Sequence, residues 1–279
     1  MKKLFVIPLL FIYSAVQAQP CYTTDVILQE TQFALESQIY GIRYGFVKNL
    51  DTLTRGLNKT GFTEMYTIWK TRKDPPNGFI LLWEPTFVYA GSSGLIGISY
   101  GPSYTKSATD SFLRHTGFYF TIWGRMEPSG PFKMLFDAGI PFEGARPEKE
   151  LTVTSPAAYL ITEQAVRKSE TEVKTHIEKF QKQSATRTFG SAIASVLRNE
   201  GNILVSYEGI LNKNGILTST TCKQKCVLTT ESISRLSSSL YVEYGEVLRQ
   251  SDNKKGHYAQ VWNVQGKEIK MISAFYKID

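Results

Sequence analysis

One frame of residues occurs twice in this chain. It reads Tyr-Gly, a loop, Gly-x-Tyr-x-x-(Ile/Val)-Trp, a turn and then Lys-Met-(Leu/Ile), and it begins at Tyr100 and again at Tyr244. The offset between the copies falls from 144 residues at these tyrosines to 137 at Lys133 and Lys270. Such drift is typical of loops that vary in length between the fixed strands of a common fold. The repeat therefore predicts two domains of similar architecture, which also suits a length of 279 residues.

The first copy begins with helical periodicity and continues with strand patterns. Apolar residues between Val26 and Val47 recur at helical spacing, and we expect Gly41 to divide this stretch into two helices. A third short helix is expected from Gly61 to Arg72. Segments rich in aromatic and β-branched residues predict strands at 79–90, 95–104, 112–126 and 132–140. This order predicts an α+β fold with helices on one face of a curved antiparallel sheet.

The second copy repeats that order with less similarity. We expect a long helix from about Ala158 to Gln183, a shorter one from Thr188 to Arg198, and strands from Ile203 to the end. A third helix is not evident in this copy. The predicted domains are 22–140 and 157–279, joined by a proline-containing linker at 141–156.

The N-terminus has the features of a secretory signal peptide. Lys2 and Lys3 precede a short apolar run, and Val16-Gln17-Ala18 is a small-residue cleavage site. Residues 1–18 are therefore predicted to be removed, and the protein is expected to be periplasmic or secreted. No later stretch is long and apolar enough for a membrane helix.

The charge, the cysteines and the histidines indicate which partners, crosslinks and metals to expect. The net charge is +7, of which Lys2 and Lys3 contribute two, and no basic block or stripe points to nucleic acid. Export would permit a disulfide between Cys222 and Cys226, and a free pair is the equal alternative. The three histidines are not at metal-ligand spacing, so neither a metal nor a cofactor is expected.

These residues resemble the NTF2-like superfamily, in particular its SnoaL-like, DUF4440-type domains. The similarity rests on Glu30-x-x-Phe33, Trp83-Glu84-Pro85, Ser93-Gly94-Leu95-Ile96-Gly97 and the Tyr100 and Tyr119 motifs. It covers most of the first copy and mainly the strand frame of the second. The resemblance implies two cone-shaped domains, each with long helices packed on a strongly bent sheet and a pocket between them. Family members include isomerases, cyclases, dehydratases and non-catalytic binding modules, so function must be argued from the pocket.

Asp137 is the candidate general base, because isomerase chemistry needs a carboxylate in an apolar pocket beside a hydroxyl. Tyr100 or Tyr119 would supply that hydroxyl. Counting from the repeat, Ala274 stands at the position of Asp137 in the second copy. The alternative is an aspartate at a strand end that hydrogen-bonds the following turn.

Candidate ligand contacts come from strand alternation. Tyr119, Thr121 and Trp123 share one strand face, and Tyr258, Gln260 and Trp262 share the equivalent face, while Trp83 comes from the Trp-Glu-Pro motif. A polar residue between two aromatics suits the wall of a pocket for a small, partly apolar ligand. It suits equally an outer sheet face covered by the other domain.

The sequence thus favours a non-catalytic module that binds a small, mostly apolar ligand. The alternatives are an isomerase or lyase that uses Asp137, and a protein-interaction domain without a pocket. We also expect the two domains to pair through their sheets as an intrachain pseudo-dimer, with Tyr119 and Trp123 close to Tyr258 and Trp262.

Overall fold

The computed structural model describes residues 22–58, 61–76, 78–107, 109–110, 112–147, 156–163 and 168–278. The predicted signal peptide, Cys21 and residues 148–155 of the predicted linker lie outside this part of the chain. The described helices are α1 (Tyr22–Tyr40), α2 (Ile42–Asn49), α3 (Met65–Thr71), α4 (Glu170–Thr186), α5 (Phe189–Val196) and α6 (Lys213–Thr218). In the described residues no helix combines the length and apolar character needed to cross a membrane.

The strands form two sheets. The strands of the first sheet are β1 (Leu50–Asn58), β2 (Gly61–Glu64), β3 (Ile80–Trp83), β4 (Phe87–Gly91), β5 (Ile96–Lys106), β6 (Arg114–Gly124), β7 (Lys133–Pro147) and β8 (Ala157–Ile161). Those of the second sheet are β9 (Leu197–Val205), β10 (Gly209–Asn212), β11 (Cys226–Arg235), β12 (Leu240–Arg249), β13 (Lys254–Gln265) and β14 (Glu268–Ile278). We call residues 22–163 the first half and residues 168–278 the second half.

The two sheets share one strand order. The first runs β2-β1-β7-β6-β5-β4-β8, with β3 also paired to β5, and the second runs β10-β9-β14-β13-β12-β11. In each sheet the strand that follows the helices pairs in parallel with the last long strand, β1 with β7 and β9 with β14. The predicted antiparallel strands are present, but each sheet also contains this parallel pair, because each helix pair returns the chain to the end of the sheet where that long strand begins.

Local sequence signals explain where several helices begin and end. Gly41 separates α1 from α2 as predicted, and its φ of 97° is a conformation that glycine adopts without a steric penalty. Ser169 and Glu172 form a reciprocal capping box at the start of α4. The predicted helix at 61–72 is a short strand, β2, followed by α3, whose first turn is capped by Glu64.

Three boundaries differ from expectation because of long-range pairing. Residues 157–161 form β8 rather than the start of a helix, since they pair in parallel with the edge strand β4. Strand β7 continues through Pro147 on β6, so the predicted linker begins inside a strand. The second half also has the third helix, α6, that its sequence did not reveal.

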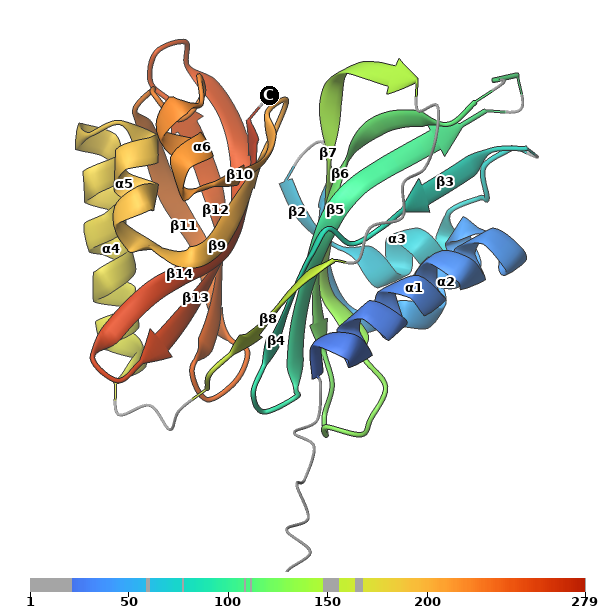
Figure 1. Ribbon diagram of the computed structural model, residues 1–279, viewed down its shortest axis with the longest axis horizontal. Helices are drawn as coiled ribbons and strands as arrows, with labels where there is room; N and C mark the ends of the chain where they lie inside the picture. Colours follow the sequence, from blue (N-terminus) through green and yellow to red (C-terminus); the bar gives the residue numbers. More distant parts are fainter. Residues whose placement is uncertain are drawn as a thin grey trace, which may run out of the picture.

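The halves stack as four layers, with helices outside and the two sheets facing each other in the middle (Figure 1). Each half has a core between its helices and its own sheet, and a third core lies between the sheets. Phe136 of β7 contacts Tyr244 of β12 and Phe275 of β14, with ring centroids 5.3 and 6.2 Å apart. Tyr89 donates a 2.7 Å hydrogen bond from its hydroxyl to the carbonyl of Glu200 across the same boundary.

The sheets meet through the strand face opposite to the one expected. Phe120 and Ile122 contribute to the core between the sheets, as do Ala259 and Val261. Tyr119 and Trp123 belong instead to the helix-facing core of the first half, and Tyr258 and Trp262 to that of the second half. The prediction that these four aromatics lie together is therefore wrong. Strand alternation shows which residues share a face, but not which layer covers that face.

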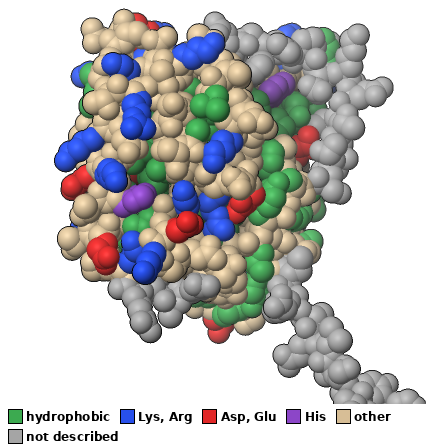
Figure 2. Space-filling model, turned by 60° about the vertical axis from the view of Figure 1, so that its left-hand side comes forward, with side chains coloured by type: hydrophobic (Ala, Val, Ile, Leu, Met, Phe, Trp, Pro, Cys, Tyr) green, Lys and Arg blue, Asp and Glu red, His purple; other side chains and the backbone are tan. Residues whose placement is uncertain are grey.

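The outer face of the second half carries mixed charges. Figure 2 shows Lys and Arg side chains scattered over it, with Asp and Glu among them rather than in a separate zone. Exposed lysines of α4, such as Lys174 and Lys179, contribute to this surface. Lys174 pairs with Glu170 one turn away.

Candidate functional site

A small cavity lies between the helices and the sheet of the first half. Its volume is about 190 Å³. Its walls are mostly apolar and aromatic, and the residues that line it are Phe33, Phe46, Leu81, Trp83, Ser103, Phe118, Tyr119, Asp137, Ala138 and Gly139. Phe33 contacts both Phe46 and Trp83, with ring centroids 5.0 and 4.6 Å apart. An apolar wall with a few polar groups is typical of a small-molecule site.

Asp137 and Tyr119 bring polar atoms to this cavity. Asp137 is partly buried and accepts a 2.8 Å hydrogen bond from the hydroxyl of Thr121. Burial raises the pKa of Asp137 to about 6, and the bond from Thr121 opposes that rise. The Tyr119 hydroxyl is buried and has no hydrogen-bond partner among the described residues. A buried hydroxyl without a partner is costly, so a ligand with a polar group would stabilise it.

Glu30 of α1 is a second buried carboxyl behind the cavity wall. It is fully buried and accepts hydrogen bonds from the Trp83 indole at 2.7 Å and the Trp123 indole at 3.0 Å, and one from the Ser99 hydroxyl. Burial raises the pKa of Glu30 to about 7, against the effect of these bonds. Because Trp83 lines the cavity, Glu30 fixes the orientation of part of its wall.

The second half has a similar arrangement built from different elements. Glu243 of β12 is fully buried and accepts hydrogen bonds from the Tyr258 hydroxyl at 2.5 Å and the Trp262 indole at 3.2 Å. Gln181 of α4 also donates to it at 2.8 Å. Burial raises the pKa of Glu243. The carboxyl that bonds the β-strand tryptophan thus comes from a helix in one half and from a strand in the other.

The register of the sheets explains why the cavity is open in the first half. Tyr119 pairs with Gly139, whereas Tyr258 pairs with Tyr276. Tyr276 is fully buried, and its ring centroid lies 4.8 Å from that of Phe189. Its hydroxyl accepts a 2.7 Å hydrogen bond from the side-chain amide of Gln260. The space that Gly139 leaves free in the first half is therefore occupied by a tyrosine ring in the second.

Asp137 has no acidic counterpart in the second half. In the first sheet Asp137 is paired with Thr121. At the equivalent position of the second sheet, Ala274 is paired with Gln260. The carboxylate of the cavity is therefore specific to the first half.

The structure brings only part of the predicted site together. Asp137, Tyr119 and Trp83 line one cavity. Thr121 and Trp123 do not line it, but Thr121 donates a hydrogen bond to Asp137, and Trp123 donates one to Glu30. Tyr100 does not join them, because its side chain lies between the sheets with its hydroxyl 3.2 Å from that of Tyr89. This is a correction to the proposed pairing of Tyr100 with Asp137.

The predicted ligand contacts of the second half are core residues. Tyr258, Gln260 and Trp262 are all fully buried. The Tyr258 hydroxyl and the Trp262 indole donate to Glu243, and the Gln260 amide nitrogen donates to the Tyr276 hydroxyl. The Gln260 Oε1 atom has no hydrogen-bond partner among the described residues. Of the two alternatives that the sequence left open for Cys222 and Cys226, a disulfide or a free pair, the structure has the free pair, and both thiols are buried. Burial raises the pKa of each thiol to about 12.

Sequence reasoning missed Glu30 and Gly139 as parts of the site. Glu30 lies in the sequence among the apolar positions Val26 and Phe33 of an amphipathic helix, and that position is the signal of a buried acid. The signal for Gly139 was its alignment with Tyr276, which places a missing side chain beside Tyr119.

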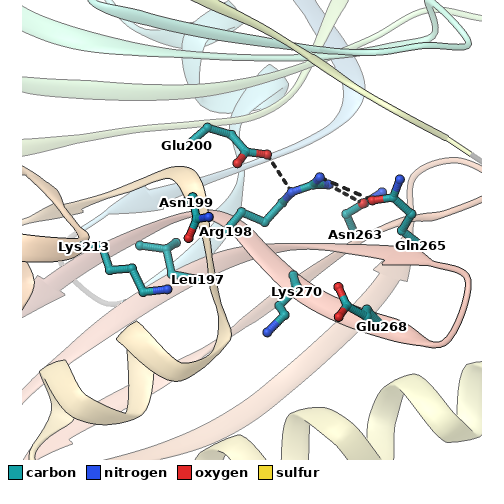
Figure 3. Close-up of a pocket in the computed structure, with 9 residues that line it drawn as sticks. All are labelled: Leu197, Arg198, Asn199, Glu200, Lys213, Asn263, Gln265, Glu268 and Lys270. Atoms are coloured by element: carbon teal, nitrogen blue, oxygen red, sulfur yellow. Dashed lines mark hydrogen bonds and ion pairs between the residues drawn. The ribbon is translucent and has the colours of Figure 1, made fainter.

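A polar pocket of about 290 Å³ lies at one end of the second sheet, lined by Arg198, Lys213, Lys270 and six other residues (Figure 3). Its arginine is already paired, with Glu200 at 2.7 Å and Asn263 at 2.8 Å. None of the predicted site residues lies there, so we take the cavity beside Asp137 as the candidate site.

Comparisons with known proteins find similarity at the level of structure. No protein-family model matches the chain, and no curated protein does. An NTF2-like protein from Cytophaga hutchinsonii is 11% identical, with a TM-score of 0.33 over 40% of this chain and 100% of its own. A DUF3225-family protein of unknown function from Pectobacterium atrosepticum is 15% identical, with a TM-score of 0.33 over 39% of this chain and 89% of its own.

Hexachlorocyclohexane dehydrochlorinase LinA-type3 from Novosphingobium barchaimii is a further match. It is 10% identical, with a TM-score of 0.32 over 39% of this chain and 88% of its own. These likenesses concern the fold alone. The DUF4440-type assignment and the tandem repeat stay predictions.

Proposed function

We propose that the first half binds one small, mostly apolar molecule in the cavity beside Asp137. The observation that carries this proposal is the contrast between Gly139 and Tyr276, because one leaves a space lined by aromatic rings and the other fills it. Tyr119 would donate a hydrogen bond to the polar group of the ligand, since its buried hydroxyl has no other partner among the described residues.

The volume limits the size of the ligand. The cavity of about 190 Å³ is smaller than the roughly 300–1,000 Å³ of sites for drug-sized molecules. An apolar cavity of roughly 150 Å³ is enough to hold benzene. The best probes are therefore single-ring compounds with one polar group, such as phenol, cyclohexanone and benzoate.

The test is a thermal-shift and calorimetric titration of the full chain with these three probes. A ligand that binds only the folded state stabilises it by about 2.7 kcal/mol at a hundredfold excess over its dissociation constant. We expect phenol or cyclohexanone to bind with one site per chain and to lose at least tenfold in affinity in Tyr119→Phe. Absence of binding by all three probes would reject the proposal, and would favour a protein-interaction domain.

A second candidate is proton transfer, favoured by the pKa of about 6 that burial gives Asp137. The ionised carboxylate would take the α-proton of a small ketone, and Tyr119 would hydrogen-bond the resulting enolate oxygen. Return of a solvent proton to the carbon completes an exchange with no net oxidation.

Deuterium exchange into cyclohexanone, followed by NMR, separates these two candidates. Enzyme-dependent exchange that is lost in Asp137→Asn, with cyclohexanone still bound, would identify a general base. Binding without exchange would identify a binding module. The variant Glu127→Gln is a matched control, because Glu127 is exposed and is not one of the residues that line the cavity.

We also propose that the protein is exported after cleavage behind Ala18, and that its halves are two NTF2-like domains paired as an intrachain pseudo-dimer. The apolar run after Lys2 and Lys3 supports export. The common strand order and the core between the sheets support the pairing. N-terminal sequencing of the purified product, starting at Gln19, tests the cleavage.

A further inference from the structure

Three possible metal ligands meet on adjacent strands of the second sheet. Glu231 of β11, Glu246 of β12 and His257 of β13 each offer one ligand atom, and these atoms lie within 4.8 Å of one another. Glu246 and His257 are directly opposite in the register of β12 and β13. Glu231 lies at the bulge between Thr230 and Ser232, where the register of β11 on β12 shifts. Bulges redirect side chains, and here one brings the second carboxylate to the cluster.

No hydrogen bond or ion pair to a described residue involves any of the three side chains. In the part of the chain that the structure describes, Glu231 and Glu246 form no ion pair, and His257 forms no hydrogen bond through its ring. The Nδ1 atom of His257 is buried and has no hydrogen-bond partner in the described part of the chain. Two carboxylates held this close repel each other unless a cation lies between them. A buried ring nitrogen without a partner is also unfavourable.

Nearby basic side chains do not neutralise the cluster. Arg55 of β1 donates instead to the Ser232 hydroxyl at 2.8 Å and lies over the ring of Tyr244. Lys277 is opposite His257 on β14, and no ion pair links it to either carboxylate among the described residues. Among the residues that the structure describes, therefore, no Lys or Arg forms an ion pair with this group of two acids and an imidazole.

We propose that Glu231, Glu246 and His257 bind a divalent transition-metal ion of the Zn²⁺ class. Two carboxylates and one imidazole form a donor set that Zn²⁺ accepts, and three protein ligands leave a coordination position for water or another group. Zn–O and Zn–N bonds of about 2.0–2.2 Å place two ligands of one ion no more than about 4.4 Å apart. The ligand atoms of the cluster lie within 4.8 Å of one another, which is close to this spacing, and both glutamates are exposed.

The site lies where the two halves of the chain meet, so a bound ion would affect the contact between them. The ring of His257 lies 5.5 Å from that of Phe62, which belongs to β2 of the first half. Gly61 also approaches this imidazole, since a Cβ there would lie 3.3 Å from it. A bound ion would fix the imidazole that packs on β2, and so would stabilise the contact between the halves. This site is independent of the cavity beside Asp137.

The experiment is an equilibrium titration of the full chain, without a polyhistidine tag, with ZnCl₂ and with CoCl₂. We expect one ion per chain with micromolar or tighter affinity for Zn²⁺, visible absorption bands on binding of Co²⁺, and a rise of the unfolding midpoint with Zn²⁺. Glu231→Gln, Glu246→Gln and His257→Gln should each weaken Zn²⁺ binding at least tenfold.

The matched controls are Glu268→Gln and His176→Gln, which change the same residue types in the same half outside the cluster. They should bind Zn²⁺ as the unaltered chain does. Absence of stoichiometric binding would overturn the proposal. So would binding that survives all three cluster substitutions, or that is lost in the His176 control.

Discussion

Tyr276 occupies, in the second sheet, the register position that Gly139 occupies in the first. Each residue pairs with the tyrosine of the Gly-x-Tyr motif on the neighbouring strand, Tyr258 in one case and Tyr119 in the other. The strands around them are arranged alike, because the strand order is shared and both sheets have a bulge immediately before the motif tryptophan. A single side chain therefore accounts for much of the difference between a filled core and an open cavity.

The first prediction is that Gly139→Tyr closes the cavity. A Cβ at this position would contact only the Phe118 carbonyl, at 3.7 Å, so the backbone tolerates a side chain there. We expect the affinity for phenol to fall at least tenfold, because the ring occupies the volume that the ligand needs. Calorimetry measures the affinity. Gly139→Ala is the control and should still bind, and a Gly139→Tyr variant that binds as before would show that phenol binds elsewhere.

The location of the cavity lining was only partly predictable from the sequence. The alternation of Tyr119, Thr121 and Trp123 correctly groups residues on one strand face, because side-chain direction is a local property. Which layer covers that face depends on contacts between residues far apart in the chain. The sequence therefore did not reveal that Phe120 and Ile122 face the other sheet.

Long-range pairing also explains the missed elements. The five residues of β8 carry no strong strand signal of their own and are held as a strand by β4. Glu231, Glu246 and His257 are separated by 15 and 11 residues, so only the register of three strands brings them together. By contrast, Gly41 was predictable as a helix break because the requirement for positive φ is local.

The second prediction concerns the pH dependence of stability through Glu30. Burial raises the pKa of Glu30 from 4.5 to about 7, so between these values the folded state holds a proton that the unfolded state releases. Its contribution to the free energy of unfolding is therefore fully present below about pH 4.5 and is lost as the pH rises through about 7. The loss corresponds to about 3 kcal/mol, at about 1.36 kcal/mol per pKa unit.

Urea unfolding of the full chain between pH 5 and pH 8 measures this effect. The free energy of unfolding should fall less steeply with rising pH in Glu30→Gln than in the unaltered chain. Asp137 contributes in the same direction, from 3.8 to about 6, so Asp137→Asn should remove a separate share at lower pH. Glu127→Gln, at an exposed position, should leave the slope unchanged. Equal slopes in all four proteins would contradict the prediction.

The third prediction is that Phe136 and Phe275 couple energetically across the sheets. Their ring centroids lie 6.2 Å apart in the core between the halves. In a double-mutant cycle with Phe136→Leu and Phe275→Leu, we expect a coupling energy of about 0.5–1.5 kcal/mol, the usual range for aromatic pairs. Chemical denaturation of the four proteins provides the values.

A second cycle serves as the reference for that pair. Phe180 belongs to the helix-facing core of the second half, so Phe136→Leu and Phe180→Leu should be additive within experimental error. Additivity in both cycles would mean that the two sheets do not pack on each other as described.

Because the two facing sheets belong to one polypeptide, amino-acid substitutions can change one sheet without changing the other. In a symmetric homodimer, every substitution alters both copies of the interface and both copies of any pocket. Here each sheet is encoded separately, so a residue on one side can change while its counterpart is kept. One member of the pair is thereby free to become a rigid support, and the other can acquire chemistry that a symmetric assembly would have to carry twice.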